Sequence, residues 1–255
     1  MEFIVIIIKV MFIEICLPIL NEERILKKNT LQLLDYCRRQ KFDFNWKIVI
    51  VNNGSTDKSS EISEKLVEKY PHRIKHVYID RPGRGRALKQ YWLSSKSDIF
   101  VYMDMDLAVD LKHIKELFKY LGGDYKMVIG SRLLPESKIE RPFLRELTSQ
   151  TYNLFCRMIL GYKFSDLQCG FKSIDRKTFF EIAPYIKGTH WFFDSEMVIL
   201  CKHFGHKVKE IPVIWRENRY NQRESKVNII RDSCVYLFAV FSFRRRLNKI
   251  KKDRN

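Results

Sequence analysis

Residues 99–110 read IFVYMDMDLAVD, and this pattern indicates which kind of sheet the chain forms. An uninterrupted apolar run, Ile99–Met103, ends in Asp104 and Asp106, with a single residue between the two acids. Continuous apolar runs of this kind are typical of strands that are buried on both faces of a parallel sheet. We therefore expect an internal strand whose carboxyl end carries two carboxylates.

Similar runs recur along the chain and alternate with segments of helical pattern. The other expected strands are Phe12–Leu17, Lys47–Val51, Ile74–Ile79 and Lys126–Ile129. The expected helices are Glu22–Arg39, Lys58–Tyr70, Arg86–Ser95 and Leu111–Leu121. This order predicts a doubly wound α/β fold with a mostly parallel sheet, in which ligands bind beyond the carboxyl ends of the strands. From 133 to 165 the sequence indicates a polar loop and a helix, followed by a turn around Ser165–Gly170.

The composition narrows the class of protein. The 255 residues suffice for one large domain or two small ones, and 45% of them are apolar, as in globular proteins. The formal net charge of +17 indicates a polyanionic partner, which could be nucleic acid, an anionic membrane surface or a phosphorylated substrate. The six cysteines are scattered without a C-x-x-C pair, which argues against a zinc site and for reduced thiols in a cytosolic setting.

The two ends of the chain carry apolar stretches of different kinds. The first, MEFIVIIIKVMFIEICLPI, is interrupted by charges and lacks the features of a signal peptide, and Met11 is an alternative start. The second, Cys234–Phe243, precedes the basic tail RRRLNKIKKDRN. Ten apolar residues are too few to cross a bilayer, so we expect an amphipathic helix that binds an anionic membrane surface. The alternative is an ordinary packed terminal helix with a solvated tail.

The acidic pair suggests a metal site. Along an extended strand, residues i and i+2 lie on the same side, so Asp104 and Asp106 could face one point. A hard divalent cation relieves the repulsion of two such carboxylates, and Mg²⁺ or Mn²⁺ completes its shell with substrate phosphate and water. The alternatives are that Asp106 caps the helix at Leu111, or that both acids are solvated loop charges.

Polar residues also follow other expected strands, as in the segments Pro18–Glu23, Asn52–Asp57 and Gly130–Arg132. Singly, each has an ordinary explanation, since Asp57 can cap a helix and Glu22 can favour a helix N-terminus. Together they converge on one crevice. The run GRGRAL that begins at Gly83 is neither a dinucleotide fingerprint nor a P-loop, but it can bring a basic helix start near a phosphate.

In combination, these motifs resemble the GT-A glycosyltransferases of family 2, which transfer sugar from a nucleotide diphosphate. The pieces that carry the resemblance are P-x-x-N-E-E (18–23), N-N-G-S-T-D (52–57), G-x-G-x-A-L (83–88), D-x-D (104–106) and G-S-R (130–132). The segments DLQCGFK (166–172) and WFFDSE (191–196) are similar to the branch of dolichyl-phosphate β-glucosyltransferase and dolichol-phosphate mannose synthase. The resemblance covers roughly 12–230. It departs from the family at Asn52 and Asn53, usually Asp, and at Ala108, often polar in the mannose-synthase branch.

The resemblance implies a role for each group of residues. The nucleotide sugar would be bound by Pro18, Leu20, Glu22, Asn52, Gly85 and Asp104. Asp104 and Asp106 would hold Mg²⁺ or Mn²⁺, and Asp106, Arg132 and Asp194 would be catalytic. The acceptor phosphate would be bound by Arg132, Arg145 and Arg223. The domain would span 1–230, with the amphipathic helix and basic tail over 231–255.

The expected activity is inverting transfer of a hexose from UDP-glucose, or from GDP-mannose, to a polyprenyl (dolichyl) phosphate. The enzyme would be peripheral, on the cytoplasmic face of a membrane. A phosphate acceptor is already an anion at pH 7 and needs no base. The alternative is a soluble family 2 enzyme that acts on a glycan hydroxyl, for which Asp194 or Glu196 would be the base. A nucleic-acid-binding protein is suggested by charge alone, because no nucleic-acid-binding motif is present, and we expect no nucleic acid partner.

Overall fold

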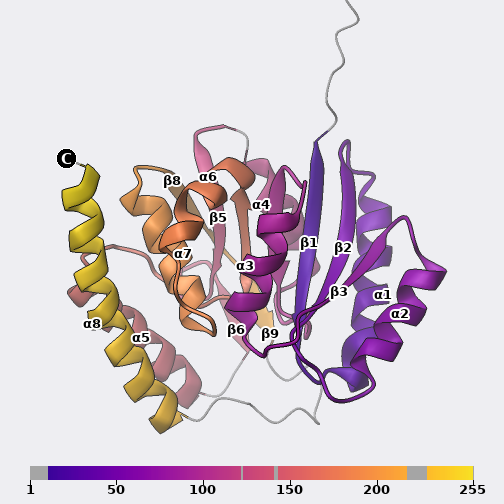
Figure 1. The fold of residues 1–255 in the computed structure, drawn as a ribbon, viewed down its shortest axis with the longest axis horizontal. Coiled ribbons are helices and arrows are strands. Elements are labelled where there is room, and N and C mark those ends of the chain that lie inside the picture. The colour runs from indigo at the N-terminus through magenta and orange to yellow at the C-terminus, as the bar shows by residue number, and fades with distance from the viewer. Residues whose placement is uncertain (1–10, 122, 141–142, 217–228, 255) are drawn as a thin grey trace, which may run out of the picture.

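The computed structural model describes residues 11–121, 123–140, 143–216 and 229–254. Its centre is a seven-stranded sheet in the order β3-β2-β1-β4-β7-β5-β8 (Figure 1). The strands are β1 (Phe12–Ile19), β2 (Asn45–Asn52), β3 (Ile74–Tyr78), β4 (Ile99–Met103), β5 (Tyr125–Ser131), β7 (Phe171–Asp175) and β8 (Lys207–Pro212). A small second sheet pairs β6 (Lys138–Glu140) with β9 (Ile214–Arg216). All neighbours in both sheets are parallel except β7, which is antiparallel to β4 and β5.

Helices cover both faces of the large sheet. The helices are α1 (Glu23–Gln40), α2 (Ser59–Lys69), α3 (Arg84–Ser94), α4 (Ile114–Lys119), α5 (Phe143–Leu160), α6 (Arg176–Ile182), α7 (Phe192–His203) and α8 (Ile229–Arg254). One hydrophobic cluster joins the sheet to α1, α2 and α4, and the other joins it to α3, α5, α6, α7 and α8. The doubly wound α/β architecture predicted from the sequence is confirmed.

Strand β1 shows why a continuous apolar run predicts a strand of the central sheet. Ile13, Ile15 and Leu17 pack in the cluster with α1, whereas Cys16 packs in the cluster with α3. Both faces of the strand are therefore covered, and neither needs polar residues. The predicted strand Ile99–Met103 has the observed bounds of β4, and the other predicted strands differ by one or two residues at their ends. The helix predicted over Leu111–Leu121 is shorter, because only Ile114–Lys119 is α-helical after a 3₁₀ turn.

The reversed strand β7 was not predicted, and it brings a later part of the chain to the acidic pair. In the register of β4 and β7, Met103 lies opposite Phe171. The residues just beyond this pair, Asp104 and Gly170, continue the contact, because the Asp104 N–H donates to the Gly170 carbonyl at 3.1 Å. The carboxyl end of β4 and the amino end of β7 thus lie at the same edge of the sheet.

The C-terminal segment is one continuous helix, whereas the sequence suggested a short apolar helix followed by a basic tail. Helix α8 continues through the basic residues to Arg254. Its side chains Val240, Phe243, Leu247 and Ile250 are buried in the cluster that includes α5 and α7. Figure 1 shows α8 beside α5 at one side of the molecule. In the described parts of the chain, no helix combines the length and apolar character that a membrane crossing requires. Residues 1–10, on which the choice of start depends, lie outside the described residues.

Candidate active site

The loops after β1 and β2 are joined into one unit by hydrogen bonds. The Glu23 N–H donates to Asp57 Oδ2 at 3.0 Å, and the Lys58 N–H donates back to Glu23 Oε2 at 3.0 Å. Each acid thereby satisfies backbone donors at the start of the other's helix, which is the capping role expected of Asp57. The Glu22 N–H adds a bond to Ser59 Oγ at 3.0 Å. This edge of the sheet is therefore held together by its own side chains.

Several residues predicted to bind the nucleotide sugar meet at this edge. Pro18 and Leu20 lie at the end of β1, next to Asn52 at the end of β2. The buried Asn52 side chain accepts from the Ser55 N–H at 2.9 Å and donates to Ser60 Oγ at 2.8 Å. Its amide thus orders the loop, a task that an uncharged side chain performs as well as the Asp expected from the family.

Asp104 and Asp106 lie in a turn and not along an extended strand. Strand β4 ends at Met103, and the Leu107 N–H donates to the Asp104 carbonyl at 3.1 Å. Leu107 has φ of +51°, and Asp106 Oδ1 accepts from the Ala108 N–H at 3.2 Å. The argument that alternation along a strand places both carboxylates on one side is therefore wrong.

Arg84, the first residue of α3, lies between two carboxylates. Its Nη1 is 2.8 Å from Asp104 Oδ1, and its Nη2 pairs with Asp194 Oδ2. The guanidinium carbon lies 4.0 Å from the centre of the Trp191 ring. Only 10% of the Arg84 side chain is exposed, so both ion pairs are largely shielded from solvent.

Asp194 has a second cationic partner in Lys172, which points inward from β7. Lys172 Nζ is 3.2 Å from Asp194 Oδ1, and both side chains are fully buried. Burial lowers the pKa of Lys172 to about 8. Burial also raises the pKa of Asp194 to about 7, although the Arg84 guanidinium opposes that change. Asp194 therefore connects two cations inside the protein and does not face a cleft.

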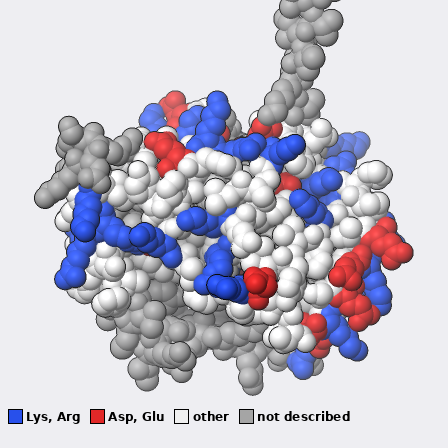
Figure 2. Space-filling model, viewed as in Figure 1, with Lys and Arg blue, Asp and Glu red and all other residues white. Residues whose placement is uncertain are grey.

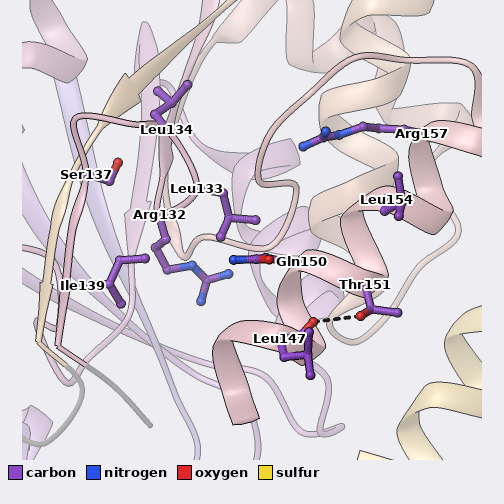
Figure 3. A pocket seen from close by; sticks show the side chains of 10 residues that line it. All are labelled: Arg132, Leu133, Leu134, Ser137, Ile139, Leu147, Gln150, Thr151, Leu154 and Arg157. Carbon is purple, nitrogen blue, oxygen red and sulfur yellow. Dashed lines mark hydrogen bonds between the residues drawn. The ribbon is translucent and has the colours of Figure 1, made fainter. Parts of the chain in front are cut away.

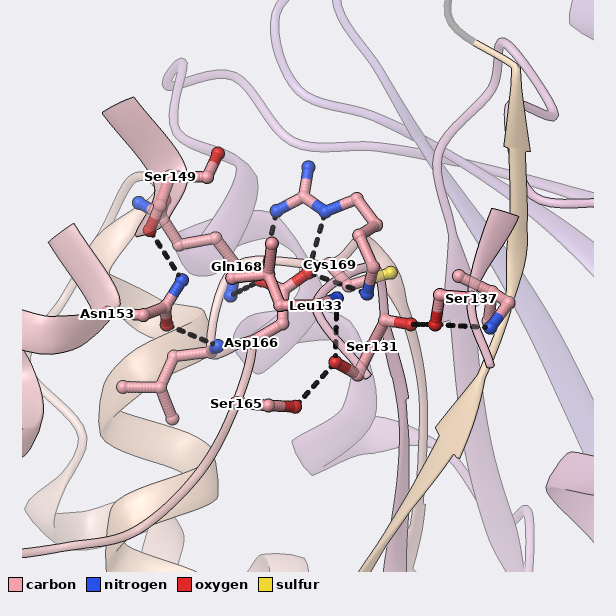
Figure 4. Close-up of polar contacts among 12 residues, drawn as sticks. Ser131, Leu133, Ser137, Ser149, Asn153, Ser165, Asp166, Gln168 and Cys169 are labelled. Carbon is pink, nitrogen blue, oxygen red and sulfur yellow. Dashed lines mark hydrogen bonds and ion pairs between the residues drawn. The ribbon is translucent and has the colours of Figure 1, made fainter. Parts of the chain in front are cut away.

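Arg132 is fixed by a buried carboxylate. Its Nε and Nη2 lie 2.6 and 3.0 Å from the two oxygens of Asp166, and its backbone N–H donates to the same group at 3.1 Å. Burial alone would raise the pKa of Asp166, but the Arg132 guanidinium prevails and lowers it to about 2. Figure 4 shows how nearby bonds, including that between Ser131 Oγ and Ser165 Oγ at 2.5 Å, tie this pair to β5 and the 165–170 turn.

A groove of about 550 Å³ opens beside Arg132. Figure 3 shows residues of the loop after β5 on one wall and residues of α5 on the other. Its lining residues are Arg132, Leu133, Leu134, Ser137, Ile139, Leu147, Gln150, Thr151, Leu154 and Arg157. The groove thus combines two arginines and three uncharged polar residues with five aliphatic side chains.

Comparison with known proteins identifies the family. Residues 14–182 match the family described as "Glycosyl transferase family 2". The protein is a family 2 glycosyltransferase.

This glycosyltransferase is similar to several curated proteins. It is 31% identical to glycosyltransferase AglD of Haloferax volcanii, over 86% of this chain and 35% of AglD, so it spans about a third of that protein's length. It is 24% identical to dolichyl-phosphate β-glucosyltransferase ALG5D of Trichomonas vaginalis, over 92% of this chain and 77% of that protein. Glucosyl-3-phosphoglycerate synthase of Mycobacterium tuberculosis, solved with Mn²⁺, UDP and glucosyl-3-phosphoglycerate, superposes with a TM-score of 0.62 at 17% identity, covering 91% of this chain and 80% of that one. The GT-A fold expected from the sequence is confirmed.

The acidic pair of the glycosyltransferase is chemically suited to a hard cation. The Asp104 carboxylate lies directly over Gly170, where an added Cβ would be 2.7 Å from Oδ1 and still closer to Cγ and Oδ2. This seat keeps the carboxylate at the protein surface, with 24% of the side chain exposed. Among the described residues, no group of three or more His, Cys, Asp or Glu side chains gathers there. Two carboxylates are enough for Mg²⁺ or Mn²⁺ when substrate phosphate and water supply the remaining ligands.

Several predicted site residues have structural contacts of their own. An added Cβ at Gly85 would lie 2.7 Å from Phe193 Cγ, so this glycine permits close packing of α3 on α7. The buried Glu196 accepts from the Lys187 and Gly188 N–H groups at 2.7 and 2.6 Å and pairs with Arg246 of α8. Arg145 belongs to α5, but its side chain lies outside the described part of the structure, as does all of Arg223.

Sequence reasoning did not assign a role to Arg84, Lys172, Asp166 or Gly170. A signal was available for Arg84, because it lies between two glycines at a helix start. Asp166, Gly170 and Lys172 fall within the DLQCGFK segment that carried the family resemblance. The structure shows that these residues neutralise and seat the predicted carboxylates and Arg132.

Proposed function

We propose that this glycosyltransferase moves a hexose from a nucleotide diphosphate sugar to the phosphate of a polyprenyl (dolichyl) phosphate, with inversion at the anomeric carbon. UDP-glucose is the favoured donor and GDP-mannose the second candidate. The observation that carries the proposal is the similarity to dolichyl-phosphate β-glucosyltransferases, which extends over 78–92% of this chain. The groove beside Arg132 supports it, because a guanidinium suits a phosphate and an aliphatic wall suits an isoprenoid chain.

The donor half of the reaction would use the edge formed by β1, β2 and β4. The base and ribose would lie against Pro18, Glu22 and Asn52, with Leu20 also on the nucleotide-sugar side. Asp104 and Asp106 would hold Mg²⁺ or Mn²⁺, and this ion would supply positive charge to the diphosphate as the sugar bond breaks. The N-terminus of α3 adds its own partial positive charge on the same side.

The acceptor half would need no general base. A phosphate monoester is an anion at pH 7, so Arg132 has to position it and not deprotonate it. The contacts of the two candidate bases, Asp194 and Glu196, support a reaction that needs no base. Asp194 is buried between Arg84 and Lys172, and Glu196 accepts two backbone N–H groups and pairs with α8. Arg145 and Arg223 would add further guanidinium donors for the same phosphate.

A direct assay tests donor and acceptor together. The protein is incubated with radiolabelled UDP-glucose or GDP-mannose and either a polyprenyl phosphate or the corresponding free polyprenol, and lipid-linked sugar is extracted and counted. We expect product from polyprenyl phosphate and UDP-glucose. Equal use of the free polyprenol would contradict the phosphate-acceptor proposal and favour transfer to a hydroxyl.

The lipid-binding groove can be tested without disturbing Arg132, whose loss would leave the buried Asp166 unpaired. Leu154 lines the groove and is 54% exposed, so Leu154→Gln removes apolar surface at little cost in folding. We expect a raised KM for polyprenyl phosphate and an unchanged KM for the nucleotide sugar. Leu93→Gln is a matched control, because Leu93 is 45% exposed on α3 and does not line the groove.

We further propose that the face formed by α5 and α8 rests on an anionic membrane on its cytoplasmic side. The two helices pack together through Phe155 and Phe241, whose ring centres are 5.8 Å apart. Phe238 is 79% exposed, and the basic Arg245 and Lys249 are exposed on the same helix. Apolar and basic groups on one helix are the combination that anchors a peripheral protein.

A vesicle assay tests this placement. We expect the protein to sediment with anionic vesicles at low salt, and Phe238→Ser to reduce the bound fraction. Phe180→Ser on α6 is the control, because Phe180 is exposed but lies on a different helix. Equal recovery in the supernatant with and without vesicles would exclude the attachment. Nucleic acid is not proposed as a partner, since Lys and Arg are interspersed with Asp and Glu on the face in Figure 2.

A further inference from the structure

Arg84 forms an ion pair with Asp104, the carboxylate that a divalent cation would need. Its Nη1 is 2.8 Å from Asp104 Oδ1, while its Nη2 pairs with the fully buried Asp194. The planar guanidinium fork reaches both acids through separate nitrogens, an arrangement that a lysine ammonium does not reproduce. In this arrangement Asp104 is already neutralised before any ligand arrives.

We propose that Arg84 competes with the divalent cation for the Asp104 carboxylate. When a nucleotide diphosphate is present, Arg84 would release Asp104 to the cation. The guanidinium and the cation carry charge of the same sign and address the same carboxylate, so they exclude one another at close range. A diphosphate adds negative charge that can hold both cations, with Arg84 on a phosphate oxygen and the metal on Asp104. This inference rests on the metal site of the proposed function. It adds that the cation and the nucleotide each bind the protein weakly when the other is absent, and tightly when both are present.

The surroundings of Arg84 make such an exchange feasible without stranding a buried charge. When Arg84 turns away from Asp104, Asp194 keeps Lys172 as a partner at 3.2 Å. The guanidinium can slide over the Trp191 ring, which lies 4.0 Å away and is 41% exposed. Gly83, with φ of +145°, precedes Arg84 and places the helix start close against Thr189. Backbone and ring therefore stay fixed while the side chain changes partner.

Binding of Mn²⁺ in the absence of nucleotide tests the competition directly. Free Mn²⁺ is measured by electron paramagnetic resonance during titration of the whole protein, Arg84→Met and Arg84→Lys. Both variants should bind Mn²⁺ more tightly than the parent, by about fivefold or more. Methionine removes the competing charge, and lysine can serve only one of the two acids. Arg86→Met is the matched control, because Arg86 lies on the same turn and bonds to the Pro82 carbonyl.

The second arm measures UDP binding by calorimetry at saturating Mn²⁺. Arg84→Met should weaken UDP binding by about tenfold, because the diphosphate loses one charged donor. Arg84→Lys covers the case in which Arg84→Met fails to fold, since it retains a cation beside Asp194. Unchanged or weaker Mn²⁺ binding in the folded variants would overturn the competition.

A further variant distinguishes failure of the proposed metal site from failure of the proposed role of Arg84. Asp104→Asn should weaken Mn²⁺ binding in the otherwise unchanged protein. If it does not, the cation does not bind at Asp104, and both the metal site and the competition are wrong. If Asp104→Asn weakens binding and the Arg84 variants do not strengthen it, the metal site stands and only the role of Arg84 fails.

Discussion

Gly170→Ala is the sharpest test of how the acidic pair is seated. The added Cβ would lie 2.7 Å from Asp104 Oδ1 and closer still to Cγ and Oδ2, whereas real Cβ atoms hardly approach another atom within 3.0 Å. The carboxylate must therefore retreat by about 1 Å, a displacement that can cost about 100-fold in rate when it affects a reacting group. Overpacking of this kind costs about 1–3 kcal/mol of folding free energy. The retreat would also lengthen the bond between Asp104 and Arg84.

The assay combines three measurements on purified Gly170→Ala: kcat for sugar transfer, Mn²⁺ affinity and the thermal midpoint. We expect a large fall in kcat, weaker Mn²⁺ binding and a midpoint lowered by a few degrees. Gly123→Ala is the control, because nothing lies within 4 Å of the Cβ it would add. Normal kcat and Mn²⁺ affinity in Gly170→Ala would show that the seat of Asp104 is irrelevant to catalysis, and would refute the reasoning.

Three further predictions concern charge. Because Arg132 lowers the pKa of Asp166 to about 2 in the folded protein, their pairing adds about 2 kcal/mol to the free energy of unfolding above about pH 4, and this contribution is lost as the pH falls towards 2. Urea unfolding between pH 5 and 2.5 should show this loss of stability, and Asp166→Asn should remove the pH dependence. Glu196→Gln and Arg246→Met should each lower the thermal midpoint, with a combined effect smaller than their sum because the two residues form one ion pair. Asp106→Asn should abolish sugar transfer and leave the thermal midpoint unchanged, because its side chain lies in a partly exposed turn and not in the core; full activity in excess Mg²⁺ or Mn²⁺ would contradict its role.

The strands that the sequence revealed are those that are buried on both faces. Strand β4 is wholly apolar, and its bounds could be read directly. Strand β7 reads FKSID, and Lys172 within it argues against a buried strand. The strand can be buried because Asp194 of α7 pairs with this lysine, which the sequence does not reveal. Strand β8 reads KVKEIP and is only partly buried. Such strands are set by partners distant in sequence, which local patterns do not contain.

The same limit applies to the candidate site. The sequence located Asp104, Asp106 and Arg132 because each follows a strand, and the structure places all three at one edge of the sheet. It could not show that Arg132 is bound to Asp166, or that Arg84 is bound to Asp104, since both pairs join separate segments. Gly85 was predicted to bind the nucleotide sugar, and the sequence could not show that its missing side chain also makes room for Phe193.

The direction of β7 has a consequence for how this architecture can diversify. Because β5 and β7 are antiparallel neighbours, the segment 132–170 leaves the sheet and rejoins it at the same edge, across a gap of about 5 Å, the spacing of adjacent strands. That segment contains β6, α5 and most of the groove. An excursion with neighbouring ends can be lengthened or exchanged at small entropic cost and without altering the register of the large sheet, provided that the pairing of β6 with β9 is kept. Under the proposed function this segment would carry most of the acceptor side, so chimeras cut at 132 and 170 would test whether acceptor preference can be transferred between relatives.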